Sequence, residues 1–389
     1  MKIKKISTHI LQYSLKEELG YSQQYYNKRT AHLIEVTTDE GITGWGECFG
    51  PGNIAVANKC IVEKVIQPLI LGLDPLNRDV IWHMVYNLLR DHGQKGMPIQ
   101  ALSGIDIALW DIAGKVANMS ISKLIGGRYR EKVEVYGYGM MLRRENLDTL
   151  VKRFSLESQK IKSEGFVATK MKVGLGPKKD IKLAESVRKG VGDDYPFMVD
   201  ANHCYTSSDA LFVGRALEEM DVYWFEEPVP PEDIEGYKEI KLKLNIKISG
   251  GEAEFARWGW NQFLQNRCVD IAQPEVCALG GISEYLKVLA IAHTNFIPVI
   301  NHVWGSAIAI ATNLQLLAAM PPVPGGLHPN EPWLEFDTTD NKFRDDLLIE
   351  PLRINEQVSK NKGWVSIPDT PGIGVEPDRD FIRKFALEL

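Results

Sequence analysis

The chain has 389 residues, of which 44% are hydrophobic and 25% are charged, the composition of an ordinary soluble globular protein. A net charge of −6 gives no indication of binding to nucleic acid or to a membrane surface, and no apolar run approaches the length of a membrane span. The five cysteines form no CxxC pair, and the basic start lacks the apolar stretch of a secretory signal. We therefore expect a cytoplasmic protein of about two or three domains with reduced thiols.

The N-terminal region alternates between apolar and polar residues, which is typical of an antiparallel sheet. Strands are predicted at residues 3–6, 31–36 and 41–47, the last two joined by a hairpin turn. The polar, tyrosine-rich residues 21–30 are predicted to form a connecting loop. Its length and aromatic content also suit a mobile flap over a ligand.

From about residue 55 to 125 the pattern becomes helical. Residues 101–112 are apolar on most sides, which predicts a deeply packed helix. Asp106 and Asp111 lie in this helix, and we interpret them as satisfied polar groups rather than ligands. A strand–helix rhythm then begins near Val133 and fades by about residue 320, where a Pro/Gly-rich run leads into an extended tail.

The stretch from Thr169 to His302 consists of short apolar strands that end on polar residues. Three of these ends are Asp200, Glu226 and Glu252, each 26 residues from the next. That spacing fits one strand, one helix and two short loops, so successive βα units would place the carboxylates at one level on neighbouring parallel strands. In a (β/α)8-type barrel this level is the C-terminal mouth, where active sites are built.

Three converging carboxylates without cysteine or histidine form an all-oxygen donor set. Such a set favours Mg²⁺ or Mn²⁺ over zinc or copper, and bound Mg²⁺ keeps positions open for substrate oxygens, so that it acts as a Lewis acid. The alternative is three unrelated acids that cap helices, which the equal spacing disfavours. Glu227 points to the other face of its strand and is predicted to be a supporting or structural partner of Glu226.

Lys170 and Lys172 are two residues apart on a predicted strand, so both side chains project to one face. If that face is the barrel interior, like charge and burial should lower a lysine pKa towards the range of a general base. A solvated pair on an exposed strand is the alternative. The following Val173-Gly174 indicates a central strand and favours the catalytic interpretation.

His302 closes another predicted strand, and Glu275 closes the strand before it. A carboxylate in that position would orient and charge the imidazole. Gly305-Ser306 then opens a helix whose N-terminus could receive an anionic group. The sequence contains no G-x-S-x-G elbow, Walker loop or GxGxxG motif, so serine hydrolase, NTPase and dinucleotide-binding functions lack support.

Six motifs carry these residues: Lys170-x-Lys172, Asp200-Ala201-Asn202, Glu226-Glu227-Pro228, Gly251-Glu252, Gln273-Pro274-Glu275 and His302-x-x-Gly305-Ser306. As a set they resemble the mandelate racemase subgroup of the enolase superfamily, over essentially the whole chain. The resemblance implies an enolase-like α/β fold in which an α+β N-terminal capping domain covers a modified TIM barrel, (β/α)7β. The expected divisions are 1–130 for the cap, 131–325 for the barrel and 326–389 for a C-terminal segment that completes the cap.

The same resemblance implies roles for individual residues. Asp200, Glu226 and Glu252 would bind Mg²⁺. Lys172 and His302 would be acid/base groups on opposite faces of the substrate, with Lys170 tuning the first and Glu275 orienting the second. Glu335 would hydrogen-bond an ene-diolate, and substrate contacts are expected from Lys170, Asn202, His203, Glu335, Gln23 and Tyr25. The subgroup usually has Asp where this chain has Glu275, and the extra methylene moves the carboxylate by more than about 1 Å.

The expected activity is abstraction of the proton α to a carboxylate of an acid sugar or its lactone, through an ene-diolate, followed by β-elimination. A racemase or epimerase using the same Lys/His pair is the closest alternative. A Schiff-base aldolase using Lys170 or Lys172 would survive EDTA, and a non-catalytic barrel would be indifferent to alanine at Lys172. The expected partner is a small acid-sugar molecule rather than nucleic acid or membrane, and the resemblance implies a homo-oligomer.

Overall fold

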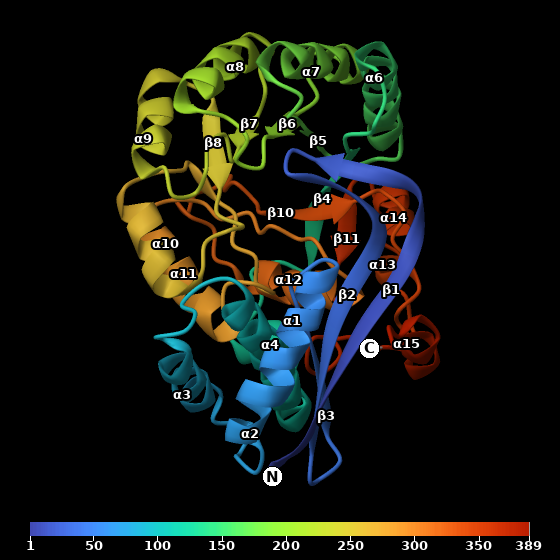
Figure 1. The fold of residues 1–389 in the computed structure, drawn as a ribbon, viewed down its shortest axis with the longest axis vertical. Coiled ribbons are helices and arrows are strands. Elements are labelled where there is room, and N and C mark those ends of the chain that lie inside the picture. Colours follow the sequence, from blue (N-terminus) through green and yellow to red (C-terminus); the bar gives the residue numbers. More distant parts are fainter. Residues whose placement is uncertain (389) are drawn as a thin grey trace.

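Two sheets organise the chain in the computed structural model, which describes residues 1–388 (Figure 1). The first is antiparallel and has the order β1 (Ile3–Tyr21), β2 (Gln24–Thr38), β3 (Thr43–Cys48). The second has eight strands, listed here in chain order: β4 (Lys132–Met140), β5 (Thr169–Lys172), β6 (Phe197–Asp200), β7 (Trp224–Glu226), β8 (Lys247–Gly250), β9 (Ile271–Ala272), β10 (Trp333–Asp337) and β11 (Trp364–Ser366).

Strands β4 to β9 pair in parallel, each with the next, as successive βα units require. Val299 continues the series through an isolated parallel bridge to Ala272, and β10 pairs in parallel with the other side of β4. The helices between these strands are α6 (Leu147–Ser163), α7 (Pro177–Val191), α8 (Ser207–Glu219), α9 (Ile234–Lys243), α10 (Ala256–Gln265), α11 (Gly281–Thr294) and α12 (Ala307–Ala319). The predicted α/β barrel with an N-terminal cap is confirmed.

The predicted loop at residues 21–30 is wrong. Strands β1 and β2 continue through it as one long hairpin whose turn is Ser22-Gln23 (Figure 1). This turn carries none of the Gly, Asn or Pro residues that mark hairpin turns in a sequence. A bulge between Ser14 and Leu19 also interrupts the alternation of β1, so the strand pattern was hidden.

The cap helices are α1 (Asn53–Ile61), a π-helical stretch (Val62–Ile66), α2 (Gln67–Ile70), α3 (Arg78–Leu89), α4 (Met97–Ala117) and α5 (Ile121–Leu124). α4 contains the predicted packed helix and is buried over most of its length. As predicted, its two aspartates are satisfied. Asp106 accepts hydrogen bonds from Ser283 N and Oγ at 2.8 and 2.6 Å, and Asp111 accepts from Trp45 N at 2.9 Å.

The C-terminal segment contributes to both parts of the molecule. Its strands β10 and β11 pair with β4 in the barrel sheet, whereas Leu387 N donates to Ile10 O of the cap strand β1 at 2.7 Å. The expected division at residue 325 therefore differs from the boundary of the sheet, because the Pro/Gly-rich run connects to a further barrel strand. The remaining helices are α13 (Lys342–Asp345), α14 (Ile354–Lys360) and α15 (Arg379–Phe385). Within residues 1–388, none of the helices combines the length and the apolar character needed to cross a membrane.

The contact between β3 and α4 depends on a missing side chain. A Cβ atom on Gly46 would lie 2.0 Å from the carbonyl oxygen of Gly104 in α4, so Gly46→Ala must push the strand and the helix apart. We expect the substitution to lower the free energy of unfolding by about 1–3 kcal/mol, the usual cost of overpacking a core. Urea denaturation followed by circular dichroism measures it. Gly326→Ala is the matched control, because a Cβ there meets nothing within 4 Å; equal stability of the two variants would contradict the packing described.

Candidate active site

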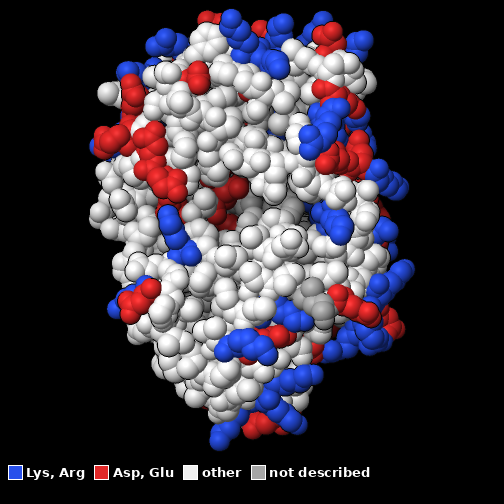
Figure 2. Space-filling view, in the orientation of Figure 1, with Lys and Arg blue, Asp and Glu red and all other residues white. Residues whose placement is uncertain are grey.

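Three acidic residues lie at the C-terminal ends of neighbouring barrel strands. Asp200 is the last residue of β6, Glu226 is the last of β7, and Glu252 follows β8 by two residues. Asp200 and Glu226 are register partners, so their side chains start from one level, as the spacing predicted. Figure 2 shows a hollow in the middle of this face of the molecule, with acidic side chains inside it.

These three side chains suit a metal ion by chemistry and by geometry. One carboxylate oxygen of each lies within 4.8 Å of the others, and Asp200 and Glu226 are buried. Oε2 of Glu252 is buried and accepts no hydrogen bond from residues 1–388, although His302 Nε2 is 3.2 Å away. Buried anionic oxygens are the donors that hard divalent cations prefer. The three carboxylates could therefore hold a divalent cation.

Neighbouring groups orient two of these carboxylates. Trp224 Nε1 and Gln273 Nε2 each donate to Oε2 of Glu226 at 2.9 Å. The backbone N–H of Asn202 donates to Oδ1 of Asp200 at 2.9 Å. Because one oxygen of each carboxylate is held in this way, the other oxygen has a fixed direction before any ligand arrives.

Lys170 and Lys172 both project into the barrel, as their spacing on β5 predicted. Nζ of Lys170 lies 2.6 Å from Oε1 of Glu226 and 2.5 Å from Oε1 of Glu335. Nζ of Lys172 pairs with Oδ2 of Asp200. Both lysines are buried, so these ion pairs lie in a medium where charge interacts strongly.

The prediction of a lowered lysine pKa is wrong for the charges that the structure describes. Burial opposes protonation of both lysines, but nearby carboxylates outweigh it and raise the pKa of each above its usual range. Asp200 is the main such group for Lys172, and Glu226 and Glu335 are the main ones for Lys170. The spacing of two lysines on one strand carries no information on carboxylates from other strands. A cation bound to the three carboxylates would offset part of this negative charge.

His302 and Glu275 lie together as expected. Nδ1 of His302 is 2.7 Å from Oε2 of Glu275, and Oε1 of Glu275 accepts from Cys277 N at 2.8 Å. The extra methylene of Glu275 is thus accommodated without loss of the imidazole contact. Burial disfavours the imidazolium, but Glu252 and the hydrogen bond to Glu275 raise the pKa of His302 to about 10.

Glu335 lies on β10 and closes the ring of charged groups. Its Oε2 accepts from Val303 N at 2.8 Å, and its Oε1 faces Lys170. Burial alone would raise the pKa of this carboxyl, but the charges of Lys170 and His302 lower it. A residue far along the chain thereby links the lysine side of the site to the histidine side.

Asn202 and His203 follow β6 in the left-handed backbone region, with φ values of 41° and 68°. His203 Nε2 is 3.1 Å from Oε2 of the buried Glu227, whose Oε1 faces Gly251 N at 3.4 Å. Glu227 thus joins the loops after β6 and β8. His203, Glu227 and Glu252 also form a second group of possible ligand atoms within 4.8 Å of one another, so the two candidate metal sites share Glu252.

The tip of the β1–β2 hairpin reaches the barrel mouth. Gln23 Nε2 and Ser22 Oγ both donate to the carbonyl oxygen of Asn202, at 2.7 and 2.8 Å. A Cβ atom on Gly174, which follows β5, would lie 2.5 Å from Cβ of Ser22, so the tip is seated closely on this loop. Gln23 therefore lies at the site, at the position where a cover over the substrate is expected.

Tyr25 does not face the same way as the other tyrosines of the hairpin. Its ring lies 4.2 Å from the guanidinium of Arg144, whereas Tyr21 and Tyr26 pack on the other face with Tyr138 of the barrel. Burial raises the pKa of Tyr26 to about 12, so its phenol is neutral. Tyr21 and Tyr26, rather than Tyr25, are thus the hairpin tyrosines on the barrel side. Because side chains alternate between the two faces of a strand, a hairpin at these residues places Tyr25 and Tyr26 on opposite faces.

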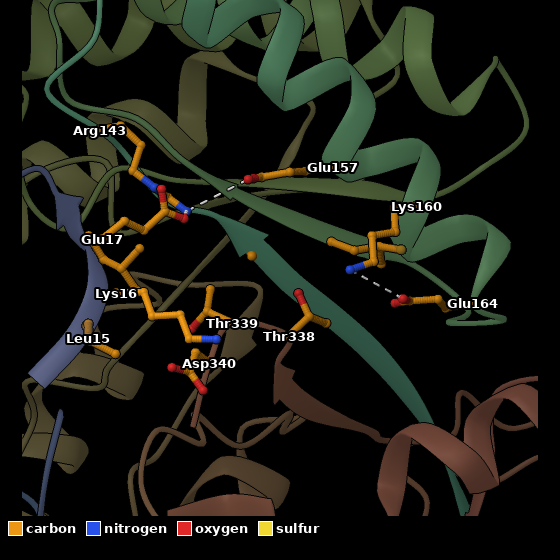
Figure 3. Close-up of a pocket in the computed structure, with 13 residues that line it drawn as sticks. Leu15, Lys16, Glu17, Arg143, Glu157, Lys160, Glu164, Thr338, Thr339 and Asp340 are labelled. Carbon is orange, nitrogen blue, oxygen red and sulfur yellow. Dashed lines mark hydrogen bonds and ion pairs between the residues drawn. The ribbon is translucent and has the colours of Figure 1, made fainter. Parts of the chain in front are cut away.

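Ion pairs hold the bulged part of β1, a few residues before the hairpin turn, beside a pocket between β1, α6 and residues 338–340 (Figure 3). Arg143 lies between Glu17 and Glu157, with N–O distances of 3.2 and 3.7 Å. Glu18 pairs with Arg144 at 2.6 Å. The bulged part of β1 is therefore tied to the barrel by charge, whereas its tip is tied by hydrogen bonds.

The N-terminus of α12, where the sequence predicted an anionic group, receives a carboxylate of the protein itself. Glu47 of β3 accepts hydrogen bonds there from Ser306 and Ala309. Glu47 was missed because its partners are about 260 residues away along the chain. A buried strand that ends on an acidic residue was its only signal.

Two family models match this chain. Residues 13–126 match the mandelate racemase / muconate lactonizing enzyme N-terminal domain, and residues 155–381 match the enolase C-terminal domain-like family. The second match alone covers more than half of the sequence. The chain therefore belongs to the mandelate racemase / muconate lactonizing enzyme family of the enolase superfamily, as its motifs implied.

Particular relatives are similar over the full length. D-galactarolactone cycloisomerase of Agrobacterium fabrum is 41% identical over 387 residues, covering 100% of this chain and 99% of that protein. The crystal structure of 3,6-anhydro-D-galactonate cycloisomerase from Zobellia galactanivorans has a TM-score of 0.86 and 34% identity, covering 100% of both chains. That of L-talarate/galactarate dehydratase from Salmonella typhimurium, liganded with Mg and L-lyxarohydroxamate, has a TM-score of 0.81 and 26% identity, covering 100% of this chain and 93% of that one.

The two overlapping carboxylate groups can be separated by mutation. If the cation binds to the group that contains Asp200 and Glu226, we expect Asp200→Asn to lower Mg²⁺ affinity by well over tenfold, because it removes a ligand. His203→Asn should change the affinity by less than about tenfold, below the usual cost of losing a residue that supports a ligand, because His203 pairs with Glu227 and not with any of these three carboxylates. Isothermal titration calorimetry of each purified variant with MgCl₂ measures both. The reverse ranking would assign the cation to His203, Glu227 and Glu252.

Proposed function

We propose that this enzyme abstracts the proton α to the carboxylate of an acid sugar or its lactone and then eliminates the β-oxygen, with Mg²⁺ as cofactor. One observation carries the proposal. Two candidate acid/base groups, Lys172 and the Glu275–His302 pair, lie on different sides of the three carboxylates proposed to hold the metal: Lys172 pairs with Asp200, whereas Nε2 of His302 is 3.2 Å from Glu252. All of these residues except the half-buried Glu252 are buried at the barrel mouth. The names of the relatives, two cycloisomerases and a dehydratase of acid sugars, support elimination over racemisation.

Asp200, Glu226 and Glu252 would hold Mg²⁺, which when bound withdraws charge from a substrate carboxylate and so makes its α-proton more acidic. Lys170 lies between Glu226 and Glu335, where its ammonium can contact the same carboxylate. Glu335, held by Val303 N, would donate a hydrogen bond to the ene-diolate in its protonated form, which the negative charge of a bound substrate favours by raising the pKa of this carboxyl. Burial of these groups strengthens each of these interactions.

Lys172 and His302 divide the proton transfers. One of them takes the α-proton, and its C–H electrons form the double bond of the ene-diolate. The β-oxygen then leaves with its electrons, and a hydroxyl leaving group takes a proton from the group on the other side. The resulting enol gains a proton at the β-carbon, loses the proton of its hydroxyl group and becomes a 2-keto acid. When the β-oxygen belongs to a lactone ring, the leaving group is a carboxylate and the product is an isomer of the substrate.

The cap supplies the surface that selects the substrate in this proposal. Gln23, Tyr21 and Tyr26 of the hairpin lie over the mouth, and Asn202 and His203 line it from the barrel. These side chains are polar or aromatic, which suits the hydroxyl groups of a sugar acid.

Proton NMR in D₂O with Mg²⁺ tests the activity across aldonic and aldaric acids and their lactones. We expect a 3-deoxy-2-keto acid from a lactone or an aldaric acid, because the site stabilises an ene-diolate next to a leaving β-oxygen. Mass spectrometry separates the two forms of the reaction, since cycloisomerisation leaves the mass unchanged and dehydration lowers it by one water. Deuterium entering the α-position without loss of oxygen would make the enzyme an epimerase and contradict elimination.

The same assay distinguishes the metal-dependent mechanism from a Schiff base. Lys172→Ala should lower kcat by about 10²–10⁴-fold, the usual contribution of a general acid or base. EDTA should remove the activity and MgCl₂ should restore it. Sodium borohydride with substrate present should leave the enzyme active. Activity that survives EDTA but is lost on reduction with borohydride would instead indicate a Schiff-base aldolase.

A further inference from the structure

The end of the cap strand β3 lies beside the barrel elements that carry Glu275 and His302. Glu47, the next-to-last residue of β3, is 3% exposed and accepts from Ser306 N at 3.0 Å, from Ser306 Oγ at 2.6 Å and from Ala309 N at 3.0 Å. These donors form the N-terminus of α12, where unpaired N–H groups and the helix dipole favour an anion. The carboxylate of a cap residue thus fixes the first turn of a barrel helix.

That first turn of α12 directly follows the loop of residues 302–306, which carries His302. Ser306 is the N-cap of α12 and lies four residues after His302, and between them Val303 N donates to Glu335 at 2.8 Å. A shift of Ser306 would therefore move the backbone that carries His302. The loop is held at one end by Glu47 of the cap and near the other by Glu335 of the barrel.

Phe49, which follows β3, contacts His302 directly and is joined to Glu275 through Cys277. Its backbone N–H donates to the carbonyl oxygen of Cys277 at 2.9 Å, and Cys277 N in turn donates to Glu275. Its ring meets the His302 ring edge to face, with centroids 5.9 Å apart and planes at 73°. Such a contact restricts rotation of the imidazole about its side-chain bonds.

The strand that carries Glu47 and Phe49 is itself rigid. Gly46 and Gly104 allow β3 and α4 to approach so closely that a Cβ on either would clash. Trp45 N donates to the buried Asp111 of α4 at 2.9 Å. The close packing of β3 on α4 therefore fixes the positions of the residues at the end of this strand.

We propose that Glu47 and Phe49 are positioning residues that hold the Glu275–His302 pair in its working geometry from the cap. Neither residue takes a proton from the substrate; Glu47 acts through Ser306 and Phe49 through Cys277 and the imidazole ring. The inference rests on the proposed acid/base role of His302. In this proposal the cap domain both lies over the substrate and positions the histidine that transfers a proton.

Glu47→Gln tests this directly. Glutamine keeps one acceptor oxygen, but its –NH₂ group replaces the other, so N–H donors face either Ser306 N or Ala309 N and the loop must shift while the size of the side chain is kept. We expect kcat to fall roughly 10- to 100-fold, as for a small misplacement of a catalytic group. KM should change by less than about threefold, because the groups that bind substrate are elsewhere. The downfield proton resonance of the imidazole N–H shared with Glu275, identified by its absence in His302→Asn, should shift or disappear.

Asp106→Asn is the matched control. Asp106 is also a buried carboxyl of the cap that accepts from a serine N–H and Oγ across the interface with the barrel, here those of Ser283. Burial raises the pKa of both Glu47 and Asp106 to about 7. The two substitutions should therefore lower the melting temperature by similar amounts. Only Glu47→Gln should lower kcat and move the imidazole resonance.

Normal kcat and an unchanged resonance in Glu47→Gln, with His302→Asn inactive, would overturn the inference and leave the proposed function intact. Full activity of His302→Asn would instead overturn the role of His302 in that function. An equal loss of kcat in Asp106→Asn would show that general weakening of the interface is responsible, which also overturns the inference. If Glu47→Gln does not fold, Ser306→Ala removes one of the same hydrogen bonds and should cause a smaller change in the same direction.

Discussion

The structure depends on keeping a large amount of negative charge buried at one end of the barrel. Asp200, Glu226, Glu275 and Glu335 are each at most 1% exposed. Taking such groups out of water costs several kcal/mol each unless opposite charges and hydrogen-bond donors compensate. Lys170, Lys172 and His302 provide positive charge, and backbone N–H groups, Trp224 and Gln273 provide donors. A divalent cation among the carboxylates would complement this arrangement. Its positive charge would also lower the pKa of Lys170 and Lys172, which the surrounding carboxylates alone raise.

The cap meets this charged mouth in two places with different consequences. The hairpin tip lies over the loops after β5 and β6, where Ser22 and Gln23 contact a backbone carbonyl. The end of β3 lies on the opposite side, where Glu47 and Phe49 contact the elements that carry the histidine pair. The first contact uses polar side chains outside the core, the half-buried Ser22 and the exposed Gln23, which can change with little effect on the core. The second is buried and joined to the packing of β3 on α4. Selection of substrate and alignment of the histidine therefore belong to separate parts of one small domain.

The sequence predicted the barrel and its acidic strand ends because parallel βα units repeat at a regular spacing and place strand ends at one level. It also predicted the Glu275–His302 contact, since neighbouring strands carry both residues. What it missed depends on contacts distant in the chain or on local exceptions. The hairpin at residues 21–30 has an unmarked turn and a bulge. The lysine pKa values depend on carboxylates from β6, β7 and β10. The partner of Glu47 lies beyond the whole barrel, and β10 lies beyond the run of prolines that looked like a boundary.

Glu275 shows how the two domains share one catalytic geometry. A glutamate in place of the usual aspartate would carry its carboxylate past the imidazole if the backbone and side chain were extended in the same way. Here Cys277 N donates to one oxygen and His302 Nδ1 meets the other, so both carboxylate oxygens of the longer side chain are held. Phe49 N donates from the cap to the carbonyl oxygen of the same residue, Cys277. If the end of β3 holds the pair as we propose, the geometry of Glu275 depends on the cap, and this limits how far the cap and the barrel can change independently of each other.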